Sequence, residues 1–209
     1  IRAPEITVYA PAKPNGIGIL VTPGGSYRRV VMDKEGSVLA PFFNARGYTL
    51  FVMTYRMPGD GHEEGANAPL ADAQRAVRFV RQNAVEWGLD PNRIGFLGAS
   101  AAGHMGALLG AKFDKKVYEP LDAADQLSAR PDFMILLYPV VSMEEKLTHP
   151  DTRTNLIGKN PSADLIKEYS ADQQVSANAP QTFIVVTEDD PAVPPQNGIN
   201  YHNALKKLG

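Results

Sequence analysis

The residues whose spacing best fits a known chemistry form the segment Gly-Ala-Ser-Ala-Ala over 98–102, directly after an apolar run that ends at Leu97. This G-x-S-x-A pattern is a near match to the nucleophile elbow, a tight strand-to-helix turn that lifts a serine hydroxyl clear of a sheet. The serine backbone in such a turn is strained, so the residues two before and two after it must be small, as Gly98 and Ala102 are. The pattern makes Ser100 a candidate nucleophile. The alternative is an ordinary capping serine at a turn of small residues.

Backbone amides that could stabilise an oxyanion are expected in the loop Pro23-Gly24-Gly25-Ser26, which follows a second apolar run. Consecutive glycines allow backbone N–H groups to turn toward a bound oxygen. Gly25 and Ser26 are therefore candidate oxyanion-hole donors, with Ala101, the residue after the candidate nucleophile, as a third. Pro-Gly-Gly is also common turn chemistry, so the loop supports catalysis only in combination with the elbow.

An acidic residue after the last apolar run could orient a catalytic histidine. Glu188, Asp189 and Asp190 follow that run, and an acid in a loop near the elbow strand suits the third member of a serine triad. Asp190 is the candidate because it stands directly before Pro-Ala-Val-Pro over 191–194. The other interpretation, a solvated acidic loop, describes Glu188 and Asp189.

The base that would complete the triad is not identified among the four histidines. In the order Ser, Asp, His a histidine must follow Asp190, and only His202 does so, within the last helical pattern. We expect His104 to be packed inside the protein, and His62 and His149 to be solvated in loops. The histidines show no metal-ligand spacing, and no glycine-rich phosphate loop opens a helix, so the sequence predicts no metal, cofactor or nucleotide.

Short apolar runs alternate with helical patterns along the chain, which predicts a doubly wound, mostly parallel sheet with helices on both faces. The last two runs are apolar at consecutive positions, so we expect both faces of these strands to be covered. The predicted strands are Ile6–Tyr9, Ile17–Thr22, Thr49–Tyr55, Arg93–Leu97, Phe133–Tyr138 and Thr182–Thr187.

Four helices are predicted, over 34–46, over 70–84, after Ser100 and over 197–208. Pro41 should kink the first of these or move its start. On the second, the arginines at 75, 78 and 81 fall mostly off the apolar stripe and are expected to be solvated. The residues expected to face inward on the first helix are Val38, Leu39, Phe42 and Phe43.

The chain has 209 residues and no linker-like segment, so one domain over 1–209 is expected. Two stretches interrupt the alternation, residues 112–131 and 142–180, and both are rich in charge, proline and asparagine. We expect them to form lid-like loops and short helices over the carboxyl edge of the sheet, where open α/β folds bind ligands.

Charge and composition exclude several classes of function. The formal net charge is −2, which gives no indication of nucleic-acid or anionic-membrane binding. No apolar run is long enough to predict a transmembrane helix. The absence of cysteine excludes disulfides, a thiolate nucleophile and zinc–thiolate sites. The oligomeric state and the compartment are left open by these features.

Together the motifs resemble the hormone-sensitive-lipase-like esterases of the α/β-hydrolase superfamily, a group that includes acetylxylan and feruloyl-type carbohydrate esterases. The resemblance covers nearly the whole chain, and its motifs are more specific jointly than individually. They are Pro23–Tyr27, Asp33–Gly36, Tyr55-Arg56, Pro69–Ala76, Trp87–Gly95, the elbow, Arg130–Phe133, Leu137–Val140 and Asp189–Pro195.

The resemblance implies Ser100 as the nucleophile, Asp190 as the triad acid, and backbone oxyanion donors at Gly25, Ser26 and Ala101. It implies a serine esterase that removes small acyl groups, acetyl above all, from a sugar or a plant polysaccharide such as xylan through an acyl-enzyme. The substrate is then a small-molecule or polysaccharide ester, and a secreted or periplasmic location is favoured.

The sequence departs from the family pattern at three places. Ser26 and Ala102 stand where the family usually has glycine, and serine at a position of positive φ costs about 1 kcal/mol. The family's final strand and its Gly-Gly-His-Gly-type loop have no counterpart, so we expect the sheet to end in an open edge. A catalytically impaired hydrolase fold used for binding is therefore one alternative function. A serine peptidase of the prolyl-oligopeptidase type is another, although the chain lacks the large gating domain of those enzymes.

Overall fold

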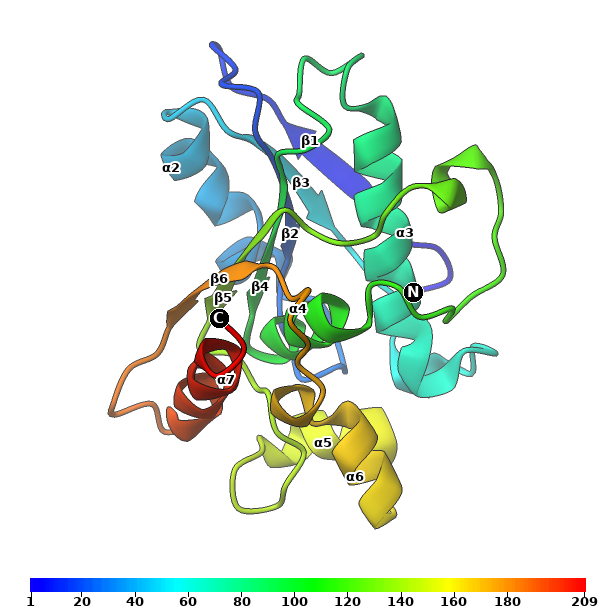
Figure 1. The fold of residues 1–209 in the computed structure, drawn as a ribbon, viewed down its shortest axis with the longest axis vertical. Helices are drawn as coiled ribbons and strands as arrows, with labels where there is room; N and C mark the ends of the chain where they lie inside the picture. Colours follow the sequence, from blue (N-terminus) through cyan, green and yellow to red (C-terminus); the bar gives the residue numbers. More distant parts are fainter.

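The computed structural model describes all 209 residues and contains one six-stranded sheet between helices (Figure 1). The strand order is β1-β3-β2-β4-β5-β6. Only β1 is antiparallel to its neighbour, β3, and every other pair is parallel. The predicted doubly wound, mostly parallel sheet is therefore confirmed. Its strands are Ile6–Tyr9 (β1), Gly18–Thr22 (β2), Thr49–Met53 (β3), Ile94–Ala99 (β4), Phe133–Leu137 (β5) and Gln181–Val185 (β6).

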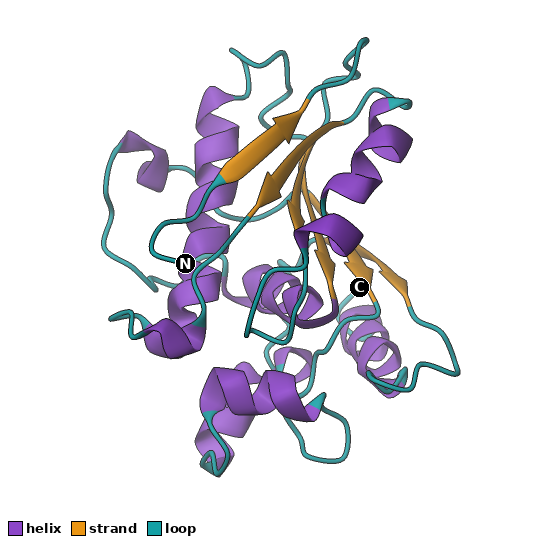
Figure 2. Ribbon diagram, turned by 180° about the vertical axis from the view of Figure 1, so that it is seen from behind, coloured by secondary structure: helices purple, strands orange, loops and turns teal.

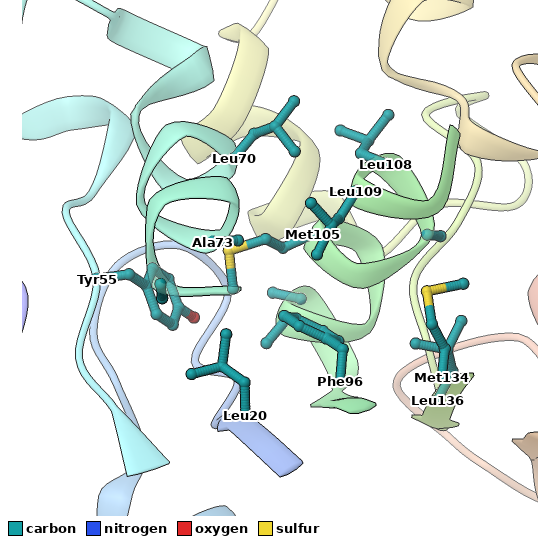
Figure 3. Packing of buried hydrophobic residues seen from close by; sticks show 14 of the residues in the cluster. Leu20, Tyr55, Leu70, Ala73, Phe96, Met105, Leu108, Leu109, Met134 and Leu136 are labelled. Atoms are coloured by element: carbon teal, nitrogen blue, oxygen red, sulfur yellow. The ribbon is translucent and has the colours of Figure 1, made fainter. Parts of the chain in front are cut away.

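The larger of two cores lies on the face of the sheet covered by α3 (Ala68–Asn83), α4 (Ser100–Lys112) and α7 (Gln196–Lys206). Figure 3 shows side chains of the strands meeting those of α3 and α4, with Leu20 and Phe96 below Ala73 and Met105. All four are at most 1% exposed. Full burial of a large apolar side chain stabilises a fold by about 1.5–3 kcal/mol, so this face fixes α4, the helix that carries the candidate nucleophile.

The opposite face is covered by α1 (Met32–Glu35) and α2 (Ala40–Asn44), which Figure 2 shows on the other side of the strands. The single helix predicted over 34–46 is thus two short helices joined by a 3₁₀ turn. Pro41 falls in the first turn of α2, where its missing N–H is no loss, so it moves the helix start. The expected inward orientation is wrong for Val38 and Phe42, which are each 56% exposed.

The expectation that both faces of β6 are covered is also wrong. Helix α7 packs on one face, where Gly198 lies against Ile184 and Val186. On the other face Phe183 is 65% exposed and Val185 37% exposed, whereas the buried core under α2 is formed by residues of β2, β3 and β4. We call Phe183, Val185 and their half-buried neighbours Phe133, Ile135 and Leu137 on β5 the uncovered face. It adjoins the free edge of the sheet, since β6 is the last strand.

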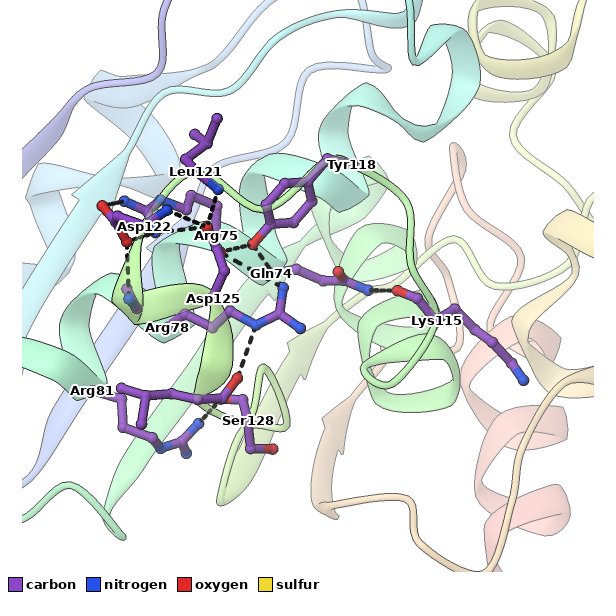
Figure 4. A network of polar contacts seen from close by, with 12 residues as sticks. Gln74, Arg75, Arg78, Arg81, Lys115, Tyr118, Leu121, Asp122, Asp125 and Ser128 are labelled. Atoms are coloured by element: carbon purple, nitrogen blue, oxygen red, sulfur yellow. Dashed lines mark hydrogen bonds and ion pairs between the residues drawn. The ribbon is translucent and has the colours of Figure 1, made fainter.

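The three arginines of α3 are not solvated as expected. They reach from the helix to the segment 113–132, as Figure 4 shows. Arg75 pairs with Asp122 and Asp125, and Arg78 donates to the Leu127 carbonyl. Arg81 donates to the carbonyls of residues 91 and 130 and to the carboxylate of residue 132. The segment that follows α4 is therefore bound along α3 by charge-assisted hydrogen bonds.

The two irregular stretches differ in their position relative to the sheet. The first runs along α3, and Asp132, which directly follows it, accepts the N–H of Ile94 at 2.8 Å, at the amino end of β4. This stretch therefore differs from the expectation, because α4 runs back across the sheet before it begins. The second leaves the carboxyl end of β5 and contains α5 (Pro150–Ile157) and α6 (Ala163–Tyr169), which lie beyond the sheet at the bottom of Figure 1. None of the helices combines the length and apolar character needed to span a bilayer.

Candidate active site

The elbow has the geometry that its sequence predicts. Ser100 is the first residue of α4, directly after β4, and its φ of +53° is the strained left-handed conformation. A Cβ added to Gly98 would lie 2.3 Å from the carbonyl oxygen of Ala102, so only glycine fits at that position. The methyl group of Ala102 is accommodated in the core. Ser100 itself is only partly buried, so its side chain is not enclosed in packed core.

The Pro-Gly-Gly loop lies directly against this serine. A Cβ added to Gly24 would lie 3.0 Å from the Cβ of Ser100. The next residues have φ values of +134° at Gly25 and +57° at Ser26, so the serine in the family's glycine position does occupy the left-handed region. The N–H groups of Gly25 and Ser26 donate to no acceptor in the protein. The N–H of Ala101 lies in the first turn of α4, where amides have no acceptor within the helix.

Three contacts from outside the loop hold it, and two of them come from residues that the sequence does not single out. The Val31 N–H donates to the Gly24 carbonyl at 3.0 Å, and the buried Tyr55 hydroxyl donates to the Pro23 carbonyl at 2.8 Å. Asn155 on α5 donates through Nδ2 to the Ser26 carbonyl at 2.8 Å. The stretch 142–180 therefore supports the backbone of the candidate oxyanion hole.

The loop also contacts a carboxylate, that of Glu35. Glu35 Oε2 accepts the N–H of Gly24 at 2.7 Å, and Glu35 Oε1 accepts the hydroxyl of Tyr138 at 3.2 Å. Burial, together with Glu35 and Asp190, raises the pKa of Tyr138 to about 12, so its hydroxyl stays protonated and donates. The sequence places Glu35 and Tyr138 in motifs of the family resemblance but gives neither a role.

Asp190 follows β6 and is partly buried, whereas Asp189 is exposed. Asp190 Oδ1 accepts the N–H of Ala192 at 2.8 Å and of Val193 at 3.0 Å, which fixes the carboxylate in a tight turn. Oδ2 has no protein partner. Tyr138 therefore lies near the Asp190 carboxylate, whose charge contributes to its raised pKa, and it hydrogen-bonds to Glu35 beside the Pro23–Ser26 loop, which we call the oxyanion loop.

No histidine completes a triad with these groups. His104 is fully buried; its Nε2 donates to the Tyr169 carbonyl at 2.7 Å, so Nδ1 must accept the Tyr27 hydroxyl at 2.9 Å. Burial lowers the pKa of His104 to about 4, so it is a neutral packed histidine, as expected. His202 is exposed on α7 and forms no hydrogen bond.

The two histidines expected to be solvated in loops are instead partly buried and hydrogen-bonded. Nδ1 of His149 accepts the N–H of Thr152 at 3.2 Å and caps α5. Nε2 of His62 donates to the carbonyl of Ile1 at 3.0 Å. Neither contacts Asp190 or Ser100, so neither can serve as the base in this arrangement.

The remaining concave and polar features do not add to the site. No three histidine, aspartate or glutamate side chains converge at metal-binding distance. A cavity of about 1070 Å³ lies between the N-terminal segment, α3 and residues 116–121, and none of the candidate site residues line it. The candidate chemistry therefore consists of the Ser100 hydroxyl, three backbone donors and the Asp190 carboxylate.

Comparison with known proteins assigns the chain to a family. The BD-FAE family model matches residues 8–205. An acetylxylan esterase of Xylanibacter ruminicola is 32% identical over 210 residues, a match that covers 98% of this chain and 40% of that protein. The chain thus spans well under half of that relative's length.

Two solved structures are similar over almost the whole chain. The acetyl ester-xyloside bifunctional hydrolase of Caldicellulosiruptor lactoaceticus superposes with a TM-score of 0.88 at 36% identity, covering 99% of this chain and 74% of that one. Thermogutta terrifontis esterase 2 phosphoramylated by tabun gives 0.77 at 26% identity, with 99% and 74% covered. This chain therefore belongs to the BD-FAE family and has the α/β-hydrolase fold.

Proposed function

We propose that the chain is a serine carboxylic ester hydrolase that removes small acyl groups, in the first place acetyl, from a sugar or a plant polysaccharide such as xylan. The observation that carries the proposal is the position of Ser100. Its strained turn lies against a loop whose Gly25 and Ser26 amides have no protein acceptor, so two donors are preorganised for the negative oxygen of a tetrahedral intermediate.

In the proposed reaction Ser100 Oγ attacks the ester carbonyl carbon and passes its proton to a histidine that Asp190 orients. The three backbone donors bind the oxyanion. When the intermediate collapses, the bond between carbon and the alcohol oxygen breaks and the histidine returns the proton to the leaving alcohol. Water then attacks the acyl-enzyme by the same route, releasing the carboxylic acid and restoring the serine.

This mechanism needs a histidine that none of the four in the chain supplies, and we assign that role to a residue beyond position 209. Asp190 Oδ2 is free to accept a hydrogen bond from it. The uncovered face and the free edge of β6 lie beside the Asp190 loop and offer apolar surface for the segment that carries it. The similar solved chains are longer than this one, which spans 74% of the Caldicellulosiruptor hydrolase.

The choice of acetyl and xylan rests on the relatives. One relative is named an acetylxylan esterase, and another is named an acetyl ester-xyloside bifunctional hydrolase. A third relative is phosphoramylated by tabun. Tabun is a reagent of the kind that reports on an activated nucleophile.

The test is to measure fluorophosphonate labelling and p-nitrophenyl acetate hydrolysis with the 209-residue chain and with a form extended beyond Gly209. We expect the extended form to label at Ser100 and to turn over, and Ser100→Ala to abolish both. Asp190→Asn should lower kcat by about 10⁴-fold, whereas Asp189→Asn, an exposed neighbour, should leave it unchanged.

Failure of the extended form to label would favour the second candidate, a hydrolase fold used for binding, which the absence of a base in this chain supports. Preference for a prolyl amide over the ester would indicate a peptidase instead. Release of acetate from acetylated xylan, compared with release from an acetylated amino sugar, then tests the proposed substrate class.

A further inference from the structure

The carboxylate of Glu35 is unusual because it is partly buried beside the candidate nucleophile and has no cation as a partner. None of the ion pairs of the protein includes it. Both of its oxygens are nevertheless used, one by the N–H of Gly24 and one by the hydroxyl of Tyr138. The free-energy cost of partly burying this carboxylate is therefore offset by hydrogen bonds and not by an ion pair.

A single glycine separates this carboxylate from Ser100. The position that a Cβ on Gly24 would take lies 2.9 Å from Glu35 Oε2 and 3.0 Å from the Cβ of Ser100. No larger residue can stand between them, so residue 24 must be glycine. Glycine leaves its own backbone free to rotate, and the order of the loop must then come from its contacts.

The backbone at Glu35 is itself held in place by a hydrogen bond and by close packing. Its N–H donates to the Val31 carbonyl at 3.1 Å. The next residue, Gly36, is buried; a Cβ there would lie 2.6 Å from the Met32 carbonyl oxygen and 3.2 Å from Cγ of Pro23. Helix α1 therefore packs its end against the first residue of the oxyanion loop, with the carboxylate directed into it.

We propose that Glu35 is a positioning residue, whose carboxylate holds the Gly24 amide so that the amides of Gly25 and Ser26 stay aimed at the oxygen of the reacting carbonyl. This inference rests on the proposed function. The Gly24 N–H reaches the carboxylate oxygen at 2.7 Å, within normal hydrogen-bond distance, so this contact can restrain a loop of two glycines. The neighbouring donors need this restraint because they have no acceptor of their own until the oxyanion forms.

Tyr138 gives the carboxylate its second anchor. Its backbone is in the left-handed region at φ +36°, and its N–H donates to the Val185 carbonyl at 2.6 Å, which ties it to β6. The hydroxyl then donates to Glu35 Oε1 at 3.2 Å. Glu35 thus joins the oxyanion loop to the residue that follows β5 through one side chain.

Two substitutions separate the effect of the length of the Glu35 side chain, which sets its reach, from the effect of its charge. In Glu35→Gln the amide oxygen can still accept from Gly24 while the amide nitrogen donates to the oxygen of Tyr138, so reach is kept and charge is lost. Glu35→Asp keeps the charge but is one methylene too short. The matched control is Asp33→Asn on the same helix, an exposed carboxylate without hydrogen bonds.

The variants are compared in the extended protein by kcat and KM for p-nitrophenyl acetate, and in the 209-residue chain by amide hydrogen exchange at residues 24–26. We expect Glu35→Asp to lose about 10- to 100-fold in kcat, since a misplacement of about 1 Å costs on that order, with little change in KM and faster exchange. Glu35→Gln should recover most of the kcat and the protection, and Asp33→Asn should match the wild type.

Loss of kcat in Glu35→Gln equal to or greater than that in Glu35→Asp would overturn the inference, because charge and not reach would then matter. Unchanged exchange at residues 24–26 in Glu35→Asp would overturn it as well. If the wild-type extended protein has no turnover, the proposed function fails, and the exchange measurement still decides whether Glu35 holds the loop.

Discussion

The Tyr27 hydroxyl donates a hydrogen bond to Nδ1 of His104 at 2.9 Å, and the two rings meet edge to face at 86°. Tyr27 directly follows the oxyanion loop, and His104 lies on α4, four residues after Ser100. One buried contact therefore ties the loop with the candidate oxyanion donors to the helix that carries the candidate nucleophile. The histidine holds its own orientation through Nε2, which donates to the Tyr169 carbonyl.

Tyr27→Phe should weaken both stability and catalysis. It leaves Nδ1 of His104 buried without a donor, which costs about 1–3 kcal/mol in the free energy of unfolding, measurable by urea denaturation. Because Tyr27 also has positive φ, at +55°, a looser side chain should let the loop relax and lower kcat. Tyr48→Phe is the control, since the Tyr48 hydroxyl forms no hydrogen bond. Equal effects of the two substitutions would contradict the role given to this contact.

The stability of the fold should fall as the pH falls from about 6.5 to 4. The pKa of His104 is lowered to about 4 by burial, whereas in the unfolded chain it is near 6.5. In that window the unfolded state binds the proton and the folded state does not, so stability rises with pH, by about 2 kcal/mol between pH 5 and 7.

The measurement is the free energy of unfolding at both pH values for the wild type, His104→Asn and His202→Gln. The pH dependence should shrink in His104→Asn and persist in His202→Gln, because His202 is exposed. The same dependence in all three proteins would show that other groups cause it.

Gly98→Ala should destroy the elbow even though it adds a single methyl group. The new Cβ would lie 2.3 Å from the Ala102 carbonyl oxygen, which belongs to the helix backbone and cannot move without shifting Ser100. We expect loss of fluorophosphonate labelling in the extended protein and a lower melting temperature. Ala102→Gly, which restores the glycine usual in the family, should keep the labelling and cost only about 1 kcal/mol of helix stability. Normal labelling of Gly98→Ala would mean that the elbow is not under steric constraint.

Sequence patterns predicted what depends on local spacing. The six strands, the elbow at Ser100 and its loop at Gly25 follow from apolar runs and small residues at fixed offsets, and all are found in the fold. The supporting contacts could not be predicted this way. Glu35 and Asn155 reach the loop from 11 and 129 residues away, and spacing along the chain carries no signal for such a meeting.

Three of the mistaken expectations share one physical cause. A helical or apolar pattern predicts that an element has an inner face but not what will cover it. Phe42 and Phe183 fit apolar patterns and are nevertheless exposed, because no other element of the described fold packs over them. The arginines of α3 fit a solvated face but meet the carboxylates and carbonyls of residues 122–132, a segment distant in the sequence.

Asp125 should prove essential for stability and irrelevant for chemistry. Its side chain is 1% exposed, and it accepts the Leu121 N–H at 2.7 Å and pairs with Arg75 at 3.1 Å. Asp125→Ala leaves those groups without their acceptor and should cost on the order of 3 kcal/mol in the free energy of unfolding, as removal of one partner of a buried ion pair does. Glu119→Ala removes a carboxylate of the same segment from an exposed pair with Lys116, so it should cost less than about 1 kcal/mol.

Labelling of Ser100 in the extended protein should be unchanged in both variants below their melting temperatures. The segment runs along α3 toward the amino end of β4, whereas Ser100 lies at the carboxyl end of β4. A loss of labelling in folded Asp125→Ala would show instead that the arginine contacts of α3 affect the candidate active site around Ser100.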